Sequence, residues 1–293
     1  MRSDWTGGEP GEERSDTSAK MDTAETAMSN PHLPPEILDH TVDLLHDDQD
    51  ALKQCCLVSK SWIPRAREHL FAAIRLRAER HLGSWKKTFP DPSTSPARYT
   101  KTLIIHCAHV VTAADADAGG WVRDFSRLVR LEMDAEAIMM YSPEPVISLA
   151  PFHGFSRTVK SLLVNSAIIP PSQIFNFILS FSLLEDLTVI RHGTSVYDGG
   201  SSDGPSTVAH PLNPPAFTGS LNLSLTEGMG HIASKLLSLP GGIHFRSLTL
   251  MRHCKEDLPL TMMLVAECSR TLESLDISCG LISTSILYLL PHR

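Results

Sequence analysis

The chain has 293 residues, a formal charge of −7, 42% hydrophobic residues and 20% charged residues. This length suffices for one large domain or two modest ones, and the composition is typical of globular proteins rather than of disordered or fibrous ones. The negative charge argues against nucleic acid or an anionic membrane as a partner of the whole protein, because both attract net positive potential.

Cellular location can be narrowed from the absence of export signals in the sequence. No run of about 18 apolar residues occurs, so we expect no transmembrane helix. The N-terminus carries acidic residues where a signal peptide needs a basic start. The six cysteines follow no disulfide framework and lie mostly in apolar or strand-like runs. We therefore expect reduced thiols in an intracellular protein of the cytoplasm or nucleus.

Shifts in composition divide the chain into four segments. Residues 1–30 lack hydrophobic periodicity and hold seven acids against three bases, which predicts a disordered tail. Residues 31–71 follow a compact helical pattern. Residues 72–99 are basic and end in prolines, which indicates a linker. Residues 100–293 contain a recurring short unit.

The helical segment predicts a bundle of three short helices. Pro34 and Pro35 suit a first helical turn, where the missing amide donor costs nothing. Apolar residues recur at helical spacing up to Leu45, a second helix is expected across Leu52–Val58, and Pro64 fits the first turn of a third. Such a bundle has more apolar surface than it can bury alone. The alternative is that these residues only close the bundle's own core.

Two motifs in this segment resemble the F-box family. Leu33-Pro34-Pro35-Glu36-Ile37-Leu38 resembles its opening motif LPxEIL, and Cys56-Leu57-Val58-Ser59-Lys60-Ser61-Trp62 resembles its closing motif LVSKxW. The chain departs from the family at Thr41, where an aliphatic residue is usual, and at His46, where proline is common. The resemblance implies docking on the adaptor of a cullin-based ubiquitin ligase. The residues expected to contact the adaptor are Leu33, Pro34, Pro35, Glu36, Ile37, Leu38, Leu52, Leu57, Val58 and Trp62.

A unit of the form apolar-x-x-Leu-x-apolar recurs from residue 100 onward. Its central leucines, 25 to 34 residues apart, are Leu103, Leu131, Leu162, Leu187, Leu221, Leu248 and Leu275. Helical segments are expected between the copies, at residues 172–182, 229–239, 258–268 and 283–290. Alternating strands and helices predict an α/β fold with a parallel sheet in a right-handed solenoid. The region resembles the irregular leucine-rich repeats that follow the F-box in many fungal proteins, although it lacks their characteristic asparagine.

Residues beside the central leucines should point away from the core, because neighbours on a strand face opposite sides of the sheet. Their mixture of polar and apolar groups suits a protein or peptide target better than a phosphate backbone. The alternative is an ordinary solvated sheet face. The candidate target-binding residues are Arg130, Glu132, Asp134, Asn165, Asp186, Thr188, Thr249 and Asp276.

Signals for catalysis, cofactors and metals are weak. Residues 228–233 match the G-x-G-x-x-A fingerprint of dinucleotide sites, but the next strand ends Met251-Arg252-His253, without the acid that binds ribose. His106, Cys107 and His109 alternate across a strand and cannot converge on zinc. No nucleophile elbow, phosphate loop or zinc-protease helix occurs. We therefore expect no enzyme activity, no cofactor and no metal.

These patterns predict a non-catalytic substrate receptor, which binds the ligase adaptor and through it a cullin while its repeats bind an unknown protein target. The chief alternative is a repeat-based interaction scaffold whose degenerate F-box has no ligase role. A nucleotide-dependent enzyme is a third hypothesis and rests only on Gly228 and Gly230. The sequence ends Leu289-Leu290-Pro291-His292-Arg293, for which we consider an exposed apolar end, a short final helix that serves as a lid, or an incomplete chain.

Overall fold

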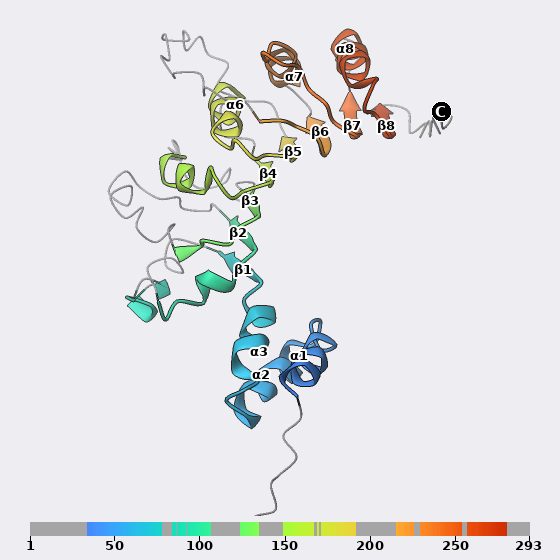
Figure 1. Ribbon diagram of the computed structural model, residues 1–293. Helices are drawn as coiled ribbons and strands as arrows, with labels where there is room; N and C mark the ends of the chain where they lie inside the picture. The colour runs from blue at the N-terminus through green and yellow to red at the C-terminus, as the bar shows by residue number, and fades with distance from the viewer. Residues whose placement is uncertain are drawn as a thin grey trace, which may run out of the picture.

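The protein consists of a small helical bundle followed by a curved α/β region (Figure 1). The computed structural model describes residues 34–77, 84–85, 87–91, 93–106, 124–134, 149–166, 169, 171–191, 215–225, 229–253 and 257–279. The predicted tail at residues 1–30 and the predicted final helix at residues 283–290 lie outside this part of the chain. No helix in the described part is long and apolar enough to cross a membrane.

Three short helices form the bundle: α1 (Pro35–Asp43), α2 (Gln49–Val58) and α3 (Ile63–Leu70). Pro34 precedes α1, so the prolines of the opening motif lie at its start, as predicted. Asp48 caps α2, because its carboxylate accepts hydrogen bonds from the amides of Asp50 and Ala51 at 3.1 and 2.9 Å. The bundle has its own small core, which consists of Val42, Leu52, Cys55 and Ala66.

Eight parallel strands follow and form one sheet in which the spatial order is the chain order. They are β1 (Ala73–Leu76), β2 (Thr102–His106), β3 (Arg130–Asp134), β4 (Ser161–Asn165), β5 (Asp186–Arg191), β6 (Ser220–Leu225), β7 (Ser247–His253) and β8 (Ser274–Cys279). Neighbouring strands pair in parallel throughout. The structure therefore confirms the prediction of an α/β fold with a parallel sheet.

The register of the sheet follows the predicted repeat. All seven central leucines lie directly opposite one another on adjacent strands, from Leu103 on β2 to Leu275 on β8. Those on β2 to β7 are at most 1% exposed. A slip of one residue would turn a whole strand inside out, so a buried leucine at the same place in each unit fixes the pairing.

The sheet begins earlier than the expected boundary at residue 100. Residues 73–76, in the segment predicted to be a linker, form β1, and Ile74 pairs with Leu103. This strand carries Ile74 where later units carry leucine, and its exposed Arg75 belongs to a basic run. Both features concealed the first copy of the unit.

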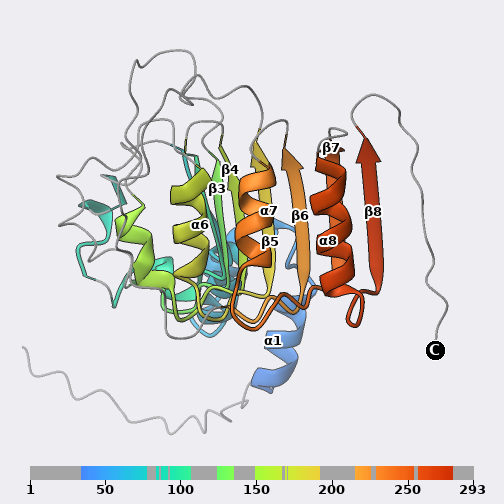
Figure 2. The same ribbon diagram turned by 90° about the horizontal axis from the view of Figure 1, so that it is seen from above.

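Helices cover one face of the sheet. They are α6 (Pro171–Leu179), α7 (Met229–Leu237) and α8 (Leu258–Cys268). Two short 3-10 helices, η1 (Pro96–Tyr99) and η4 (Ala150–Phe155), occur earlier in the chain. Figures 1 and 2 show α6, α7 and α8 side by side in front of the strands, on the outer side of the curve. The main core lies between these helices and the sheet. No described helix covers the inner face of the sheet, which we call the helix-free face.

Candidate protein-binding surfaces

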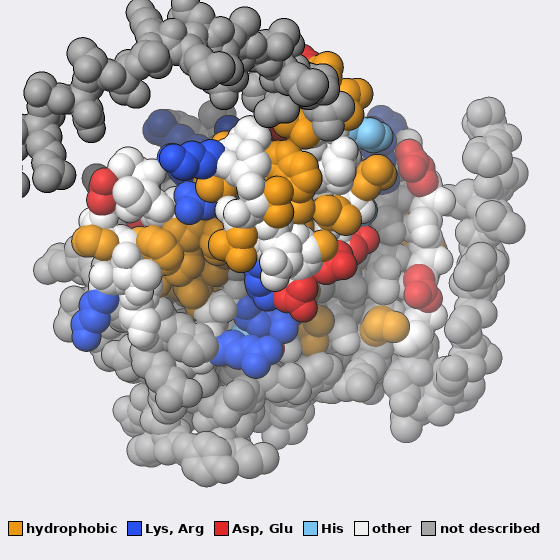
Figure 3. Space-filling view, turned by 90° about the horizontal axis from the view of Figure 1, so that it is seen from below, with side chains coloured by type: hydrophobic (Ala, Val, Ile, Leu, Met, Phe, Trp, Pro, Cys, Tyr) orange, Lys and Arg blue, Asp and Glu red, His pale blue; other side chains and the backbone are white. Residues whose placement is uncertain are grey.

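The helical bundle exposes large apolar side chains. The exposed fraction is 51% for Ile37, 70% for Leu44, 79% for Leu57 and 70% for Val58. We call these four residues the apolar bundle surface. Viewed from the side on which the bundle lies, hydrophobic side chains gather near the centre of the molecule, with acidic side chains along one edge (Figure 3). In globular proteins, exposed apolar side chains that form a patch mark contacts with other macromolecules, whereas singly exposed ones are normal.

The bundle core is closed without the apolar bundle surface. Val42, Leu52 and Ala66 are fully buried, and Cys55 is 5% exposed. Leu45, Trp62 and Leu70 pack around them and are partly buried. The exposed residues therefore contribute little to the core, and the alternative that the motif residues only close the bundle does not account for them.

The predicted adaptor-contacting residues fall into groups of different burial. Leu38 and Trp62 are half-buried. The residues that lie exposed are Pro34, Pro35, Glu36, Ile37, Leu57 and Val58. The prediction that Leu52 lies on this surface is wrong, because this residue is fully buried on the side of α2 that packs inside the bundle. Leu33 lies outside the described residues. Leu44 was missed as an exposed residue, because the sequence placed it in the apolar helical face together with Leu45.

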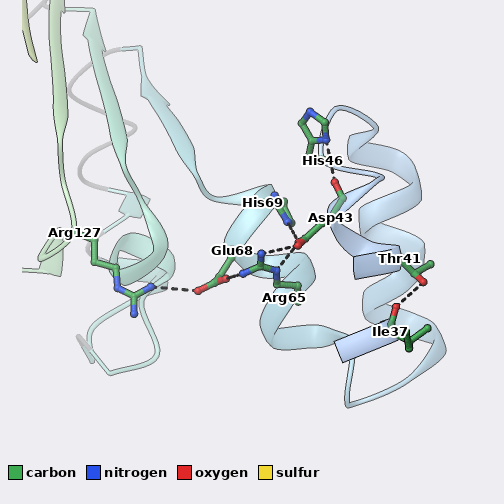
Figure 4. A network of polar contacts seen from close by, with 8 residues as sticks. All are labelled: Ile37, Thr41, Asp43, His46, Arg65, Glu68, His69 and Arg127. Atoms are coloured by element: carbon green, nitrogen blue, oxygen red, sulfur yellow. Dashed lines mark hydrogen bonds and ion pairs between the residues drawn. The ribbon is translucent and has the colours of Figure 1, made fainter. Parts of the chain in front are cut away.

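The two departures from the F-box motif each make a local hydrogen bond. The Thr41 hydroxyl donates to the carbonyl of Ile37 at 2.8 Å, within α1. The His46 Nδ1–H donates to the carbonyl of Asp43 at 3.0 Å (Figure 4). The carbonyls in the last turn of a helix have no amide partner within that helix. The His46 side chain makes a hydrogen bond to one of them. The turn after α1 is held by a side chain where the family usually has proline.

A polar network joins the end of α1 to α3 and to the sheet region (Figure 4). Asp43 accepts from Arg65 through both carboxylate oxygens, at 2.5 and 2.8 Å, and its Oδ1 lies 2.7 Å from His69 Nε2. Arg65 also donates to Glu68 at 2.6 Å, and Glu68 accepts from Arg127 at 3.2 Å. Arg127 precedes β3, so this chain of charges connects the bundle to the first strands of the sheet.

Acid should weaken the junction between α1 and α3. The hydrogen bond from Arg65, followed by that from His69, holds the pKa of Asp43 far below its ordinary value of 3.8. A carboxyl with a depressed folded-state pKa adds stability above its ordinary pKa and loses it as the pH falls further. We expect Asp43→Asn to lower the melting temperature at pH 7, and we expect its deficit relative to wild type to narrow progressively below pH 4, measured by thermal unfolding.

The matched control for this experiment is Asp39→Asn, which changes an exposed carboxylate on the same helix. We expect it to leave the melting temperature nearly unchanged at both acidic and neutral pH. A deficit of Asp43→Asn that stays constant from pH 7 to pH 3 would contradict the account, because it would mean that the ionised carboxylate adds no stability.

The predicted target-binding residues all lie on the helix-free face, because each alternates along its strand with residues that are buried or, beside Asp276, partly buried. The strands bring them together in two groups. The first group, on β3 to β5, is Arg130, Glu132, Asp134, Asn165, Asp186 and Thr188; the second, on β7 and β8, is Thr249 and Asp276. Ser220, Asn222 and Ser224 of β6 lie between the groups and were missed, although the same alternation around Leu221 marks them.

Several of these residues bond to one another. Arg130 donates to Glu132 at 2.6 Å. Asp134 accepts from Asn165 of the next strand at 3.2 Å, and its other oxygen lies 3.1 Å from His106 Nδ1. These bonds run across three neighbouring strands. They restrain Arg130, Glu132, Asp134 and Asn165 of the first group relative to one another.

Asp186 also connects two neighbouring strands, β5 and β6, through hydrogen bonds. Its Oδ1 accepts from both the amide and the hydroxyl of Ser220, each at 2.7 Å. A side-chain carbon on Gly219 would overlap this carboxylate and would lie 3.0 Å from the carbonyl of Glu185. The absence of a side chain at residue 219 therefore allows β5 and β6 to meet at their first residues.

Gly219→Ala should destabilise the sheet by about 1–3 kcal/mol, because overpacking forces the Asp186 carboxylate or the backbone to move. The matched variant Ser220→Ala removes only the hydroxyl bond and should cost about 0.5–1.5 kcal/mol. Chemical denaturation of the two variants beside wild type measures both losses. A Gly219→Ala protein as stable as wild type would contradict this reading of the junction.

The weaker sequence signals either serve helix packing or fall outside the described residues. Gly230 lies in α7, where an added side-chain carbon would be 3.3 Å from Leu260 of α8, so this glycine allows the two helices to pack closely. Gly228, Cys107 and His109 lie outside the described part of the chain. Within that part, no group of three His, Cys, Asp or Glu residues could hold a metal ion.

Comparison with models of protein families, with curated proteins and with solved structures gives no significant match for this chain.

Proposed function

We propose that the chain is a substrate-recognition subunit of a cullin-based ubiquitin ligase, with the bundle docked on the adaptor. One observation carries the proposal: Ile37, Leu57 and Val58 lie exposed while the bundle core is closed by other residues. These three belong to the two motifs that resemble the F-box. Exposed aliphatic side chains grouped on helices are typical anchors for a partner's groove.

We further propose that the α/β region is an irregular leucine-rich-repeat solenoid whose helix-free face binds the protein target. The parallel strands in chain order and the matching positions of the central leucines support this assignment. On the helix-free face, charged and amide groups lie beside apolar residues such as Leu163 and Ile190. This mixture resembles the surfaces through which proteins bind proteins.

The proposed mechanism is proximity, and the receptor itself performs no chemistry. A receptor of this kind accelerates ubiquitin transfer by holding its target at a fixed distance from the ligase. The polar network from Asp43 through Arg65 and Glu68 to Arg127 is consistent with this mechanism, because it connects the bundle to the sheet region.

Hydrogen exchange with and without the purified adaptor tests the docking surface. We expect the adaptor to slow exchange of amides in α1 and in the second half of α2, and to leave β3 to β7 unchanged. Slowing confined to the sheet, or no slowing at all, would contradict the proposal. In that case an interaction scaffold with no ligase role would become the better description.

A further inference from the structure

The helix-free face carries more acidic than basic side chains along most of the sheet. From β3 to β8, the charged residues whose side chains the structure describes on this face are Arg130, Glu132, Asp134, Asp186 and Asp276. One cation stands against four carboxylates, which leaves a net charge of −3. The face is the inner side of the curved sheet (Figure 1), where the fields of several charges of one sign add.

The basic residues of this face do not cancel the excess. Arg130 donates to Glu132 at 2.6 Å, so this pair is neutral and the three aspartates remain. Arg75 also lies on the face, but on β1, four strands away from Asp186 and seven strands away from Asp276. Strands about 4.8 Å apart put Arg75 roughly 19 Å or more from these two carboxylates, beyond the Debye length of about 10 Å at 0.1 M salt.

Apolar side chains lie in the middle of the same face. Leu163 of β4, Ile190 of β5 and Met251 of β7 alternate with buried residues, and Met251 is 39% exposed. We call these three residues the apolar centre. Ser224 of β6 pairs with both Ile190 and Met251, so a small side chain lies between two longer apolar ones. These two are roughly 10 Å apart, two strand spacings, which leaves room above Ser224 for an aliphatic side chain of a ligand.

Two acceptor atoms of the helix-free face lack a hydrogen-bond donor. Asn222 Oδ1 and His106 Nε2 are buried and make no hydrogen bond within the described part of the chain. The His106 Nδ1–H donates to Asp134 at 3.1 Å, so the neutral ring keeps its lone pair on Nε2. Both side chains as a whole are only half-buried. The rotamer changes that are common at interfaces can therefore turn each atom toward a donor of a ligand.

We propose that the helix-free face between β3 and β8 binds a cationic segment of the protein target. An aliphatic side chain of this segment packs on the apolar centre above Ser224, and lysine or arginine side chains meet Asp134 on one side of it and Asp276 on the other. The inference rests on the proposed function, because it names the chemistry of the target expected at that face. The same carboxylates repel an acidic segment.

The size of the face sets the length of the segment. The five strand spacings from β3 to β8 amount to roughly 24 Å. An extended segment of about seven residues spans this distance. Lysine and arginine carry hydrogen-bond donors and no acceptors, which matches a face whose unpartnered atoms are acceptors.

Selection from a phage-displayed library of random peptides of about 12 residues, longer than the span requires, tests the proposal with the full chain as bait at low salt. We expect the enriched peptides to be positively charged and to carry an aliphatic residue flanked by lysine or arginine. The most enriched peptide then serves as the probe in fluorescence anisotropy. Its affinity should fall at least about 3-fold as salt rises from about 50 to about 500 mM, because salt screens charges at a surface.

Two pairs of matched variants locate the site of this peptide. Asp276→Lys reverses a charge on the helix-free face, whereas Glu267→Lys makes the same change at an exposed residue of α8, behind the other face. We expect a loss of about 3- to 10-fold in affinity for the first and none for the second. Met251→Thr should lose at least about 5-fold. Val129→Thr, just before β3 at a residue that is 42% exposed, should bind as wild type does.

Each other outcome overturns the proposal. Failure to enrich any peptide above an unrelated protein, or enrichment of neutral or acidic peptides, would refute a cationic target. Equal affinities within either pair would place the peptide outside the helix-free face. A thermal transition close to that of wild type shows that each variant folds.

Calorimetry with the adaptor on the same preparation separates this inference from the proposed function. Adaptor binding without selection of cationic peptides would overturn the inference alone. Selection of cationic peptides without adaptor binding would overturn the ligase role alone.

Discussion

Leu57→Lys should weaken adaptor binding by at least about 100-fold and leave the fold intact. Leu57 is 79% exposed near the end of α2, so the substitution removes little packing. A lysine there also suits the negative end of the helix dipole. In the complex, however, the ammonium group would be buried against apolar surface without a partner, which costs several kcal/mol. Each 1.4 kcal/mol corresponds to a tenfold change in affinity.

The control for this prediction is Leu183→Lys, which changes a leucine that is 49% exposed in the turn before β5. Calorimetric titration of each variant into the adaptor should give wild-type affinity for Leu183→Lys and a large loss for Leu57→Lys. Equal affinities for the two variants would remove Leu57 from the docking surface. Thermal unfolding should show both variants to be within about 0.5 kcal/mol of wild type, as is usual for surface substitutions.

Leu52→Ala, unlike Leu57→Lys, should reduce the stability of the fold itself. We expect the bundle to lose about 2–5 kcal/mol of unfolding free energy. Leu52 is fully buried in a small core that it shares with Val42, Cys55 and Ala66, so the cavity has few neighbours that could fill it. The sheet has a separate core and should remain folded. Hydrogen exchange should therefore show faster exchange in α1, α2 and α3 and unchanged exchange in β4 and β5.

Leu57→Ala is the matched comparison, because it truncates the same residue type on the same helix at an exposed site. We expect its cost to be below about 0.5 kcal/mol. A Leu52→Ala protein as stable as Leu57→Ala would contradict the division of α2 into a buried side and an exposed side.

The sheet could be predicted almost completely from the sequence, because one buried leucine recurs in each unit. Burial alternates along a strand, so the leucine specifies both the face and the register. β1 escaped prediction for a physical reason. It has Ile74 at the central position and lies in a basic run, so neither its residue type nor its surroundings resembled the later units.

The bundle surface was less predictable, because an apolar helical residue can face either a core or a partner. The motifs located Ile37, Leu57 and Val58 correctly on the surface, but the apolar pattern of the second helix led us to place Leu52 there as well. Only the packing of α2 inside the bundle separates Leu52 from Leu57. The Asp43 network was not foreseen either, since Arg65 and His69 approach Asp43 from 22 and 26 residues away in sequence.

Titration of the full-length protein into the purified ligase adaptor, followed by calorimetry, tests the account most directly. We expect a 1:1 complex with a dissociation constant below about 1 μM, which corresponds to roughly −8 kcal/mol of binding free energy. The contradicting result is a folded, monomeric chain that gives no measurable heat at adaptor concentrations of about 100 μM, well above that dissociation constant. It would argue against the proposed role in ubiquitin transfer.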